Sequence, residues 1–266
     1  MRLIPPSRSR LLVTTGLALL LAGAVAGCKT TRSSDVTGSV GTARTMTNEA
    51  DARQAVEAWG ERYRANPRDP EAAVRYAQGL RGIGQRAQAA AVLEQASIHN
   101  PKNRMVLGAY GRALADVGSF AQALDVLSRA HTPDQPDWRI LSVQGAVLDQ
   151  MGRHEEARRY YASALRLAPG EPSVLSNLGL SYALTKDLKQ AEQVLRQAGA
   201  RGSADPRVRQ NLALVIGLQG RFAEAEQIAR ADLPADEAAA NVAYLQQMIA
   251  AHQQKSAPAN AMASRS

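Results

Sequence analysis

The chain has 266 residues, a formal net charge of +8 and one cysteine; 45% of its residues are hydrophobic and only 4% are aromatic. A single cysteine excludes a disulfide framework within one chain. Scattered basic residues, few aromatics to stack on bases and the lack of zinc-finger, RRM or KH spacing argue against nucleic-acid binding. Abundant alanine and interspersed charges of both signs favour an all-α fold over a sheet.

The first 27 residues are predicted to form a secretory signal peptide. Residues 1–10 are basic, and residues 11–27 (LLVTTGLALLLAGAVAG) are apolar or small, as in the n-region and h-region of such a peptide. A transmembrane helix usually needs about 20 apolar residues. This segment, rich in Gly, Ala and Thr, is therefore marginal as a retained membrane span.

The only cysteine directly follows this segment. Val25-Ala26-Gly27-Cys28 resembles the lipobox of bacterial lipoproteins, in which an aliphatic residue and two small residues precede a cysteine. The resemblance implies cleavage before Cys28 and lipidation (palmitate) at that residue, so that buried acyl chains hold the protein to a membrane. Ordinary cleavage after Ala26, at an A-x-A site, would leave a free thiol instead.

The residues after the cysteine bear on location and flexibility. In the lipoprotein family an Asp directly after the cysteine often signals inner-membrane retention, and here the residue is Lys29. We therefore expect a periplasm-facing outer-membrane lipoprotein rather than an inner-membrane one.

Residues 28–49 are rich in Ser, Thr and Gly and have few apolar side chains, so they cannot bury enough surface to fold alone. They are predicted to be a lipidated flexible tether.

A 34-residue period organises the chain that follows. A helix over 50–66 ends before Pro67, and five repeats are predicted at 70–103, 104–137, 138–171, 172–205 and 206–239. Position 8 of each repeat is small: Ala77, Gly111, Gly145, Gly179 and Ala213. Position 15 is Gly84, Gly118, Gly152, Lys186 and Gly220. Position 20 is alanine throughout: Ala89, Ala123, Ala157, Ala191 and Ala225.

This spacing predicts two antiparallel helices in each repeat, because larger apolar residues also recur three and four residues apart. Paired helices approach closely only where their side chains are small, so positions 8 and 20 are expected to face each other. Position 15 is expected to end the first helix in the left-handed conformation, which glycine adopts without steric cost.

At these positions the chain resembles the tetratricopeptide repeat. The third repeat matches that family's pattern best, through Leu141, Gly145, Leu148, Ala157, Tyr161, Ala164 and Pro169. The resemblance implies an all-α, right-handed superhelical solenoid of antiparallel helix pairs over 50–252, in which residues 50–66 form an N-terminal half unit. Arg209 and Asp232 depart from the pattern and mark the fifth repeat as degenerate. A capping helix is predicted over 235–252, and a disordered tail over 253–266.

Motifs for catalysis, cofactors and metals are missing from the sequence. It contains no phosphate-binding G-x-x-x-x-G-K-[ST] loop and no G-x-S-x-G elbow. The four histidines, His99, His131, His154 and His252, lack metal-ligand spacing, and we expect them to be ordinary surface residues. The sequence therefore predicts no catalytic residue, no cofactor and no metal site.

The first helices offer a binding surface instead. In tetratricopeptide arrays they line the concave face, and positions 2, 6, 9 and 13 share one helical stripe. In the fourth and fifth repeats this stripe combines polar and leucine side chains, and the predicted partner-binding residues are Asn177, Leu180, Leu184, Arg207, Asn211, Leu214 and Leu218. An amide both donates and accepts, which suits an extended peptide backbone.

An alternative for this surface stays open: the asparagines are solvated and the leucines pack against the neighbouring helix. The same stripes in the first three repeats are charged and mixed, without an evident apolar slot, as in Met105, Ala109, Arg112 and Asp116. The C-terminal half of the array is therefore the predicted binding region.

The whole layout, from the lipobox through the segment TTRSSDVTGSV to five repeats, resembles the TadD family, lipoproteins of the tight-adherence (Tad/Flp) pilus assembly system. The resemblance implies a non-enzymatic scaffold that binds pilus or secretin proteins and aids secretin assembly or localisation. Two alternatives remain: an adaptor for peptidoglycan-processing enzymes or outer-membrane protein insertion, and an enzyme whose site the motifs do not reveal.

Overall fold

The computed structural model describes residues 41–201 and 205–263, and the side chains of residues 50–200 and 205–252. The described residues form twelve α-helices and the turns between them, with one isolated β-bridge between Thr132 and Gln135. The prediction of an all-α fold is confirmed. Cys28 and the predicted signal peptide lie outside the described residues.

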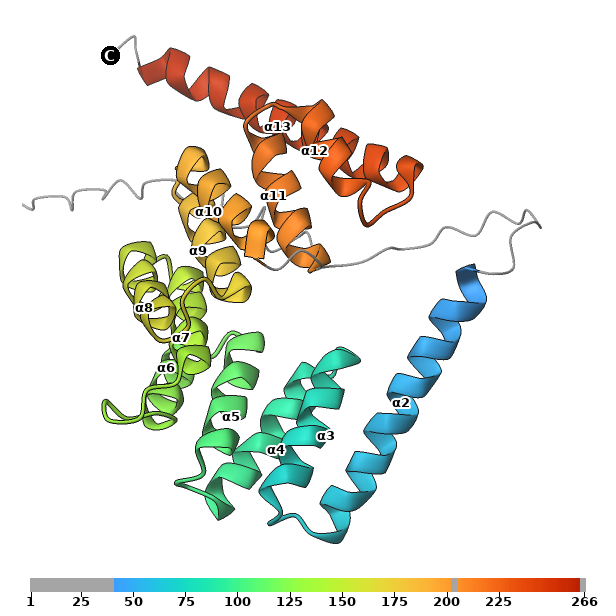
Figure 1. Ribbon diagram of the computed structural model, residues 1–266, viewed down its shortest axis with the longest axis vertical. Coiled ribbons are helices and arrows are strands. Elements are labelled where there is room, and N and C mark those ends of the chain that lie inside the picture. The colour runs from blue at the N-terminus through green and yellow to red at the C-terminus, as the bar shows by residue number, and fades with distance from the viewer. Residues whose placement is uncertain (1–40, 202–204, 264–266) are drawn as a thin grey trace, which may run out of the picture. The chain divides into compact units, whose positions relative to one another are not determined.

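Five helix pairs follow the long helix α2 (Gly41–Ala65) and precede the long helix α13 (Ala235–Ala263) (Figure 1). The pairs are α3 (Pro70–Gly82) with α4 (Arg86–His99), α5 (Arg104–Asp116) with α6 (Phe120–Arg129), α7 (Trp138–Gln150) with α8 (His154–Leu167), α9 (Pro172–Leu184) with α10 (Leu188–Arg201), and α11 (Pro206–Leu218) with α12 (Phe222–Ala229). Each first helix thus begins at the first residue of a predicted repeat.

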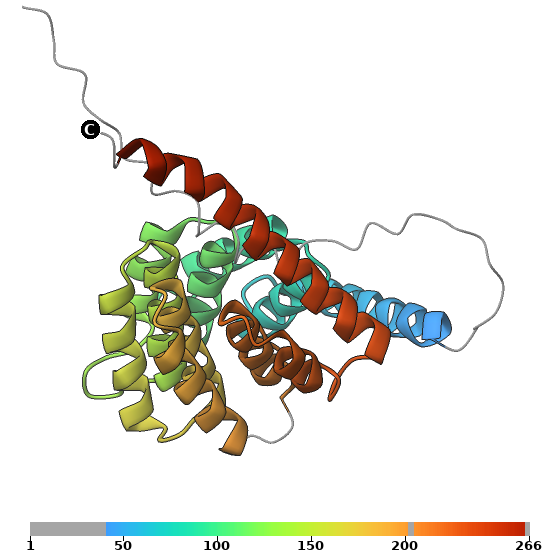
Figure 2. The same ribbon diagram turned by 90° about the horizontal axis from the view of Figure 1, so that it is seen from above.

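Both end helices are longer than the sequence predicted. α2 begins at Gly41 rather than at residue 50, because residues 42–49 contain no proline or glycine that would stop a helix. The expected tether over 28–49 therefore overlaps this helix. α13, seen along its length in Figure 2, continues to Ala263, past the expected end at residue 252. Alanines favour a helix in this segment, although Pro258 lies within it and removes one backbone donor.

The residue before each repeat fixes the start of its first helix. These N-cap residues are Asp69, Asn103, Asp137, Glu171 and Asp205, and the side chain of each accepts a hydrogen bond from the backbone N–H two residues later. Such caps satisfy a backbone donor that the helix itself leaves unpaired. Every repeat therefore depends on the last residue of the segment before it.

The expected left-handed residue after each first helix is confirmed. The four glycines at position 15 have φ between 75° and 83°, and Lys186 at the same position has φ 65°. Lys186 is thus a non-glycine residue in a conformation that L side chains rarely adopt.

The close helix contact differs from the one predicted. A Cβ atom placed on Gly145 would lie 2.6 Å from Cε1 of Tyr161, and one on Gly179 would lie 2.6 Å from Cγ of Leu195. Tyr161 and Leu195 are at position 24, so position 8 meets position 24 first rather than position 20. The reason is that alanine at position 20 is short, whereas the larger side chain one turn later reaches across to the glycine.

Successive repeats stack through their first helices. α3 contacts α5, α5 contacts α7, α7 contacts α9 and α9 contacts α11, and each second helix also packs on the first helix of the next repeat. The buried core follows this stack, from Val56 of α2 to Val242 of α13. In the described part of the chain, none of the helices has the length and apolar character needed to cross a membrane.

Candidate functional site

The predicted asparagines lie at the junctions between first helices. Nδ2 of Asn177 in α9 donates to Oγ of Ser142 in α7 over 3.1 Å, and Nδ2 of Asn211 in α11 donates to Oγ of Ser176 in α9 over 2.9 Å. Each bond joins position 6 of one repeat to position 5 of the repeat before. The asparagines are therefore not simply solvated, since each holds two repeats together. Their carbonyl oxygens accept no hydrogen bond from the residues that the structure describes.

The leucines of the same stripes are half-buried. Leu180 and Leu184 in α9, and Leu214 and Leu218 in α11, each keep part of their surface accessible. Arg207 is exposed, and its guanidinium lies 3.2 Å from the carboxylate of Asp205, the N-cap of its own helix. The structure thus places the seven predicted residues on two adjacent first helices, as partly accessible side chains.

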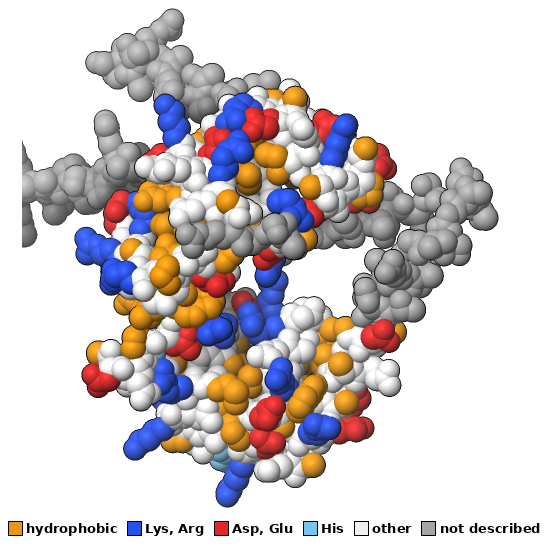
Figure 3. Space-filling view, in the orientation of Figure 1, with side chains coloured by type: hydrophobic (Ala, Val, Ile, Leu, Met, Phe, Trp, Pro, Cys, Tyr) orange, Lys and Arg blue, Asp and Glu red, His pale blue; other side chains and the backbone are white. Residues whose placement is uncertain are grey.

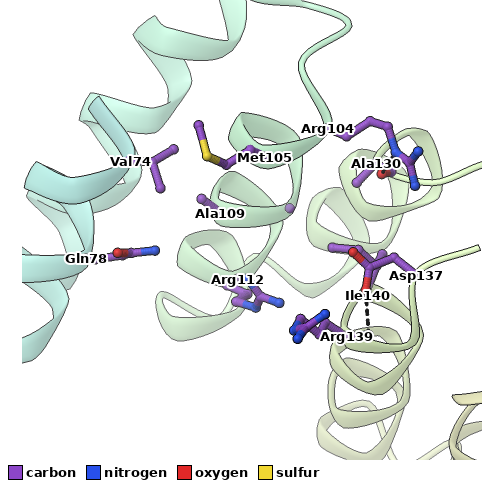
Figure 4. A pocket seen from close by; sticks show the side chains of 11 residues that line it. Val74, Gln78, Arg104, Met105, Ala109, Arg112, Ala130, Asp137, Arg139 and Ile140 are labelled. Atoms are coloured by element: carbon purple, nitrogen blue, oxygen red, sulfur yellow. Dashed lines mark hydrogen bonds between the residues drawn. The ribbon is translucent and has the colours of Figure 1, made fainter. Parts of the chain in front are cut away.

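A cavity of about 500 Å³ lies on the first helices of repeats one to three instead (Figure 4). Val74 and Gln78 of α3, Met105 and Arg112 of α5, and Ile140 of α7 contribute to its lining. None of the seven residues predicted in repeats four and five takes part. The predicted stripe of positions 2, 6, 9 and 13 leaves out position 5, where the wall of this cavity is formed by Val74 and Gly108.

Gly108 lets α7 pack closely against α5 at the wall of the cavity. A Cβ atom there would lie 2.7 Å from Cδ1 of Ile140, so only glycine lets Ile140 reach α5 without a shift. Met105 remains 48% exposed at the cavity although it is a large apolar residue. The cavity therefore combines an apolar surface with the charged groups around it.

Those charged groups are mainly arginines. Arg104, Arg112 and Arg139 line the cavity together with one carboxylate, Asp137. In the space-filling view, Lys and Arg side chains gather where this face is hollowed beside α5 and α7 (Figure 3). A recess with such an excess of positive charge attracts anionic groups.

Two of these four side chains are engaged in the protein itself. Arg104 donates from Nε to the carbonyl of Ala130, and from Nη1 and Nη2 to the side-chain and backbone oxygens of Gln135, over 2.7–3.1 Å. Asp137 accepts from the backbone N–H of Arg139 over 2.8 Å as the N-cap of α7. Arg104 thereby fixes the loop after α6, and Asp137 fixes the start of α7.

A buried polar cluster joins repeats three and four. The carboxylate of Asp149 accepts from the hydroxyls of Tyr161 over 2.9 Å and Ser181 over 2.8 Å, and it lies 2.9 Å from Nδ1 of His154. Burial, followed by the charge of Asp149 and its hydrogen bond, raises the pKa of the Tyr161 hydroxyl far above its ordinary value. This phenol therefore stays protonated and donates to Asp149.

The geometry of this cluster does not suit nucleophilic catalysis. A serine nucleophile must bond to the imidazole that takes its proton, whereas Ser181 is fully buried and donates to Asp149.

The expectation that the histidines are ordinary surface residues is wrong for His154 and also for His131, whose Nε2 lies 3.2 Å from Oε1 of buried Gln144. Among the described side chains, no group of three or more His, Cys, Asp or Glu residues is placed to hold a metal ion.

Three sequence profiles described as tetratricopeptide repeat match the chain, over residues 77–137, 150–215 and 206–231. Together they cover parts of all five helix pairs. A comparison with curated protein sequences finds no match.

Solved structures with the same arrangement of helices include PilW, described as a widely conserved type IV pilus biogenesis factor. It has a TM-score of 0.62 and 18% sequence identity, over 76% of this chain and 94% of PilW. A thermophilic TPR protein from Thermus thermophilus has a TM-score of 0.59 and 24% identity, over 67% of this chain and 99% of that one. PilF of Pseudomonas aeruginosa has a TM-score of 0.50 and 19% identity, over 70% and 82%. At these identities the likeness shows the fold.

Proposed function

The chain is a tetratricopeptide-repeat protein, and on this premise we propose that it is a non-enzymatic scaffold of the bacterial cell envelope that aids assembly of a Tad/Flp-type pilus secretion machine. The observation that carries the scaffold role is the stack of first helices, which presents one partly accessible surface across five repeats. Repeat arrays of this kind bind protein partners along such extended surfaces.

The envelope location rests on the N-terminal sequence. The lipobox-like Val25-Ala26-Gly27-Cys28 and the basic and apolar residues before it favour export and lipidation at Cys28. Lys29 favours the outer membrane, with the repeats facing the periplasm. The pilus role rests on the resemblance of the whole layout to TadD lipoproteins. The fold shared with PilW, itself described as a pilus biogenesis factor, is compatible with that role.

The anchor is tested by Cys28→Ala in cells that make the full chain. The expected result is loss of labelling by a radioactive or clickable palmitate analogue and release of the protein from the membrane fraction. Cys28→Ser is a useful second variant, because serine is close to cysteine in size but lacks the thiol that would carry the lipid. Membrane association of Cys28→Ala at the wild-type level would contradict the proposed anchor.

The pilus role is tested by crosslinking the wild-type protein in envelope membranes and identifying its partners. Secretin or other pilus subunits are the expected partners, and deletion of the gene should reduce the secretin multimer in the outer membrane. Recovery of peptidoglycan enzymes or of the outer-membrane insertion machinery, with normal secretin multimers, would contradict the pilus role and leave the scaffold role standing.

A further inference from the structure

Arg112 lies in the cavity without a carboxylate bonded to its guanidinium among the described residues. It makes no hydrogen bond or ion pair with any residue that the structure describes, although its side chain is only partly accessible. Burial lowers the pKa of its guanidinium, the charges of Arg81 and Arg139 lower it further, and Asp137 alone opposes them. A guanidinium is costly in such surroundings unless an anion is close by.

The neighbouring arginines differ in what they can offer a ligand. Arg81 forms an ion pair with Asp116, and Arg104 is held by the loop after α6. Arg139 lies over the ring of Trp138 at 4.4 Å from the ring centroid. Stacking orients the guanidinium plane and leaves its N–H groups at the edge for hydrogen bonds. Arg112 and Arg139 extend toward the same part of the cavity in Figure 4.

Apolar surface accompanies this pair of charges. Met105 exposes nearly half of its surface at the cavity, whereas Val74, which lines the cavity on the side of α3, is buried. The amide of Gln78 stands at position 9 of its repeat, as Arg112 does in the next, and an amide can bond to a peptide backbone in both directions. The cavity therefore holds side chains suited to bind a carboxylate, an aliphatic side chain and a peptide backbone.

We propose that this cavity binds an extended segment of a protein partner, with an Asp or Glu carboxylate between Arg112 and Arg139 and an adjacent aliphatic side chain on the exposed part of Met105. This proposal rests on the proposed scaffold function and names the chemistry of the partner. A segment of protein fits better than an anionic membrane surface, because the half-buried Arg112 lies in a recess lined by three helices. Lipid headgroups are bound most readily by basic side chains that project from a surface.

In the test, random peptides displayed on phage are selected for binding to the purified wild-type protein. The complete mature chain is used, so that the repeats keep their flanking segments. Selected peptides are expected to be enriched in Asp or Glu next to Leu, Ile or Val. Replacing the acidic residue by its amide, and separately making Arg112→Gln, should each weaken binding about tenfold or more, since charge-assisted bonds to carboxylates are the strong ones. Fluorescence anisotropy with the labelled peptide measures both effects.

The matched control is Arg159→Gln, which removes the same charge from an exposed site on α8 of the third repeat. It should change the affinity by less than about twofold. Asp137→Asn tests the proposal in the opposite direction. Asn caps a helix as well as Asp does, so this variant keeps the start of α7 while it removes the carboxylate that competes for Arg112. It should bind the acidic peptide more tightly, which no loss of folding can imitate.

Selected peptides without acidic residues, or unchanged binding by both Arg112→Gln and Arg139→Gln, would overturn the proposal while leaving the scaffold role intact. A selection that yields no binder would also overturn it, and the pilus role is judged separately by the secretin measurements. If vesicles of phosphatidylglycerol, but no acidic peptide, bind in a way that Arg112→Gln abolishes, the cavity serves a membrane and the proposal is wrong.

Discussion

The side-chain amide of Asn211 donates to the hydroxyl of Ser176, 35 residues earlier in the chain, over 2.9 Å. Asn177 and Ser142 form the same bond one repeat before. Ser142 and Ser176 are both buried, so these bonds are shielded in part from water. Two neighbouring repeat junctions are therefore held by the same pair of residue types.

We expect Asn211→Ala to lower the free energy of unfolding by about 1 kcal/mol, the usual net worth of one such bond. A double-mutant cycle with Ser176→Ala measures the interaction itself, and the coupling energy should be of similar size. Urea unfolding followed by circular dichroism is the measurement. A coupling energy near zero would show that the bond does not stabilise the junction.

Gly145→Ala should destabilise the third repeat. The new methyl group would lie 2.6 Å from the ring of Tyr161, which is 1% exposed and cannot move into solvent. Overpacking of this kind costs about 1–3 kcal/mol, measured as a loss in the free energy of unfolding. Gly82→Ala is the control, because that helical glycine has open space around its Cβ position. The free energy of unfolding of Gly82→Ala should be unchanged or rise by up to about 1 kcal/mol from helix propensity. Equal losses in the two variants would refute the packing argument.

Lys186→Gly should make the protein more stable. Lys186 has φ 65°, where the other four repeats have glycine. Left-handed backbone costs a residue with a Cβ roughly 1–2 kcal/mol, and part of this gain is lost because glycine is more flexible when unfolded. The net effect should be a rise in melting temperature by calorimetry. Gln193→Gly, in the exposed part of α10, should lower it. A melting temperature that falls in both variants would contradict the expectation.

Acid should destabilise the junction between repeats four and five. Burial alone would raise the pKa of Glu192, but hydrogen bonds from Gln219, Arg221 and Arg196 outweigh it and lower the pKa. The Arg196 hydrogen bond lowers the pKa of Glu224 as well. The ordinary pKa of an unfolded Glu is about 4.3. The stabilisation is therefore complete above about pH 4.3 and is lost as the pH falls through the lowered folded values.

The corresponding measurement is the urea midpoint at several values between about pH 6 and pH 3. It should fall with acidity in the wild type and fall less steeply in Glu192→Gln, which has no carboxylate to protonate at that position. Glu94→Gln, at an exposed site on α4, serves as the control and should follow the wild-type curve. If Glu192→Gln has the same pH dependence as the wild type, the arginine contacts of Glu192 do not contribute as described.

The repeat could be predicted from the sequence because its rules are local. Glycine at position 15 indicates a left-handed turn, and small residues at position 8 indicate a close helix contact. Both signals depend only on residues within one repeat. The asparagine bonds and the cavity depend on how one repeat is placed on the next. Ser142 and Asn177 meet only through that placement, and Val74, Arg112 and Ile140 come from three different repeats. A helical stripe drawn on single helices could not bring them together.

The caps have a practical consequence for cutting the chain into modules. A repeat that is excised or exchanged from Trp138 onward would lose Asp137, and with it the side chain that accepts from the backbone N–H of Arg139. The natural unit for grafting is therefore shifted by one residue and begins at the cap, as in 137–170. Hybrids joined at that boundary keep each helix start with its own acceptor, whereas hybrids joined one residue later inherit an acceptor from a foreign sequence.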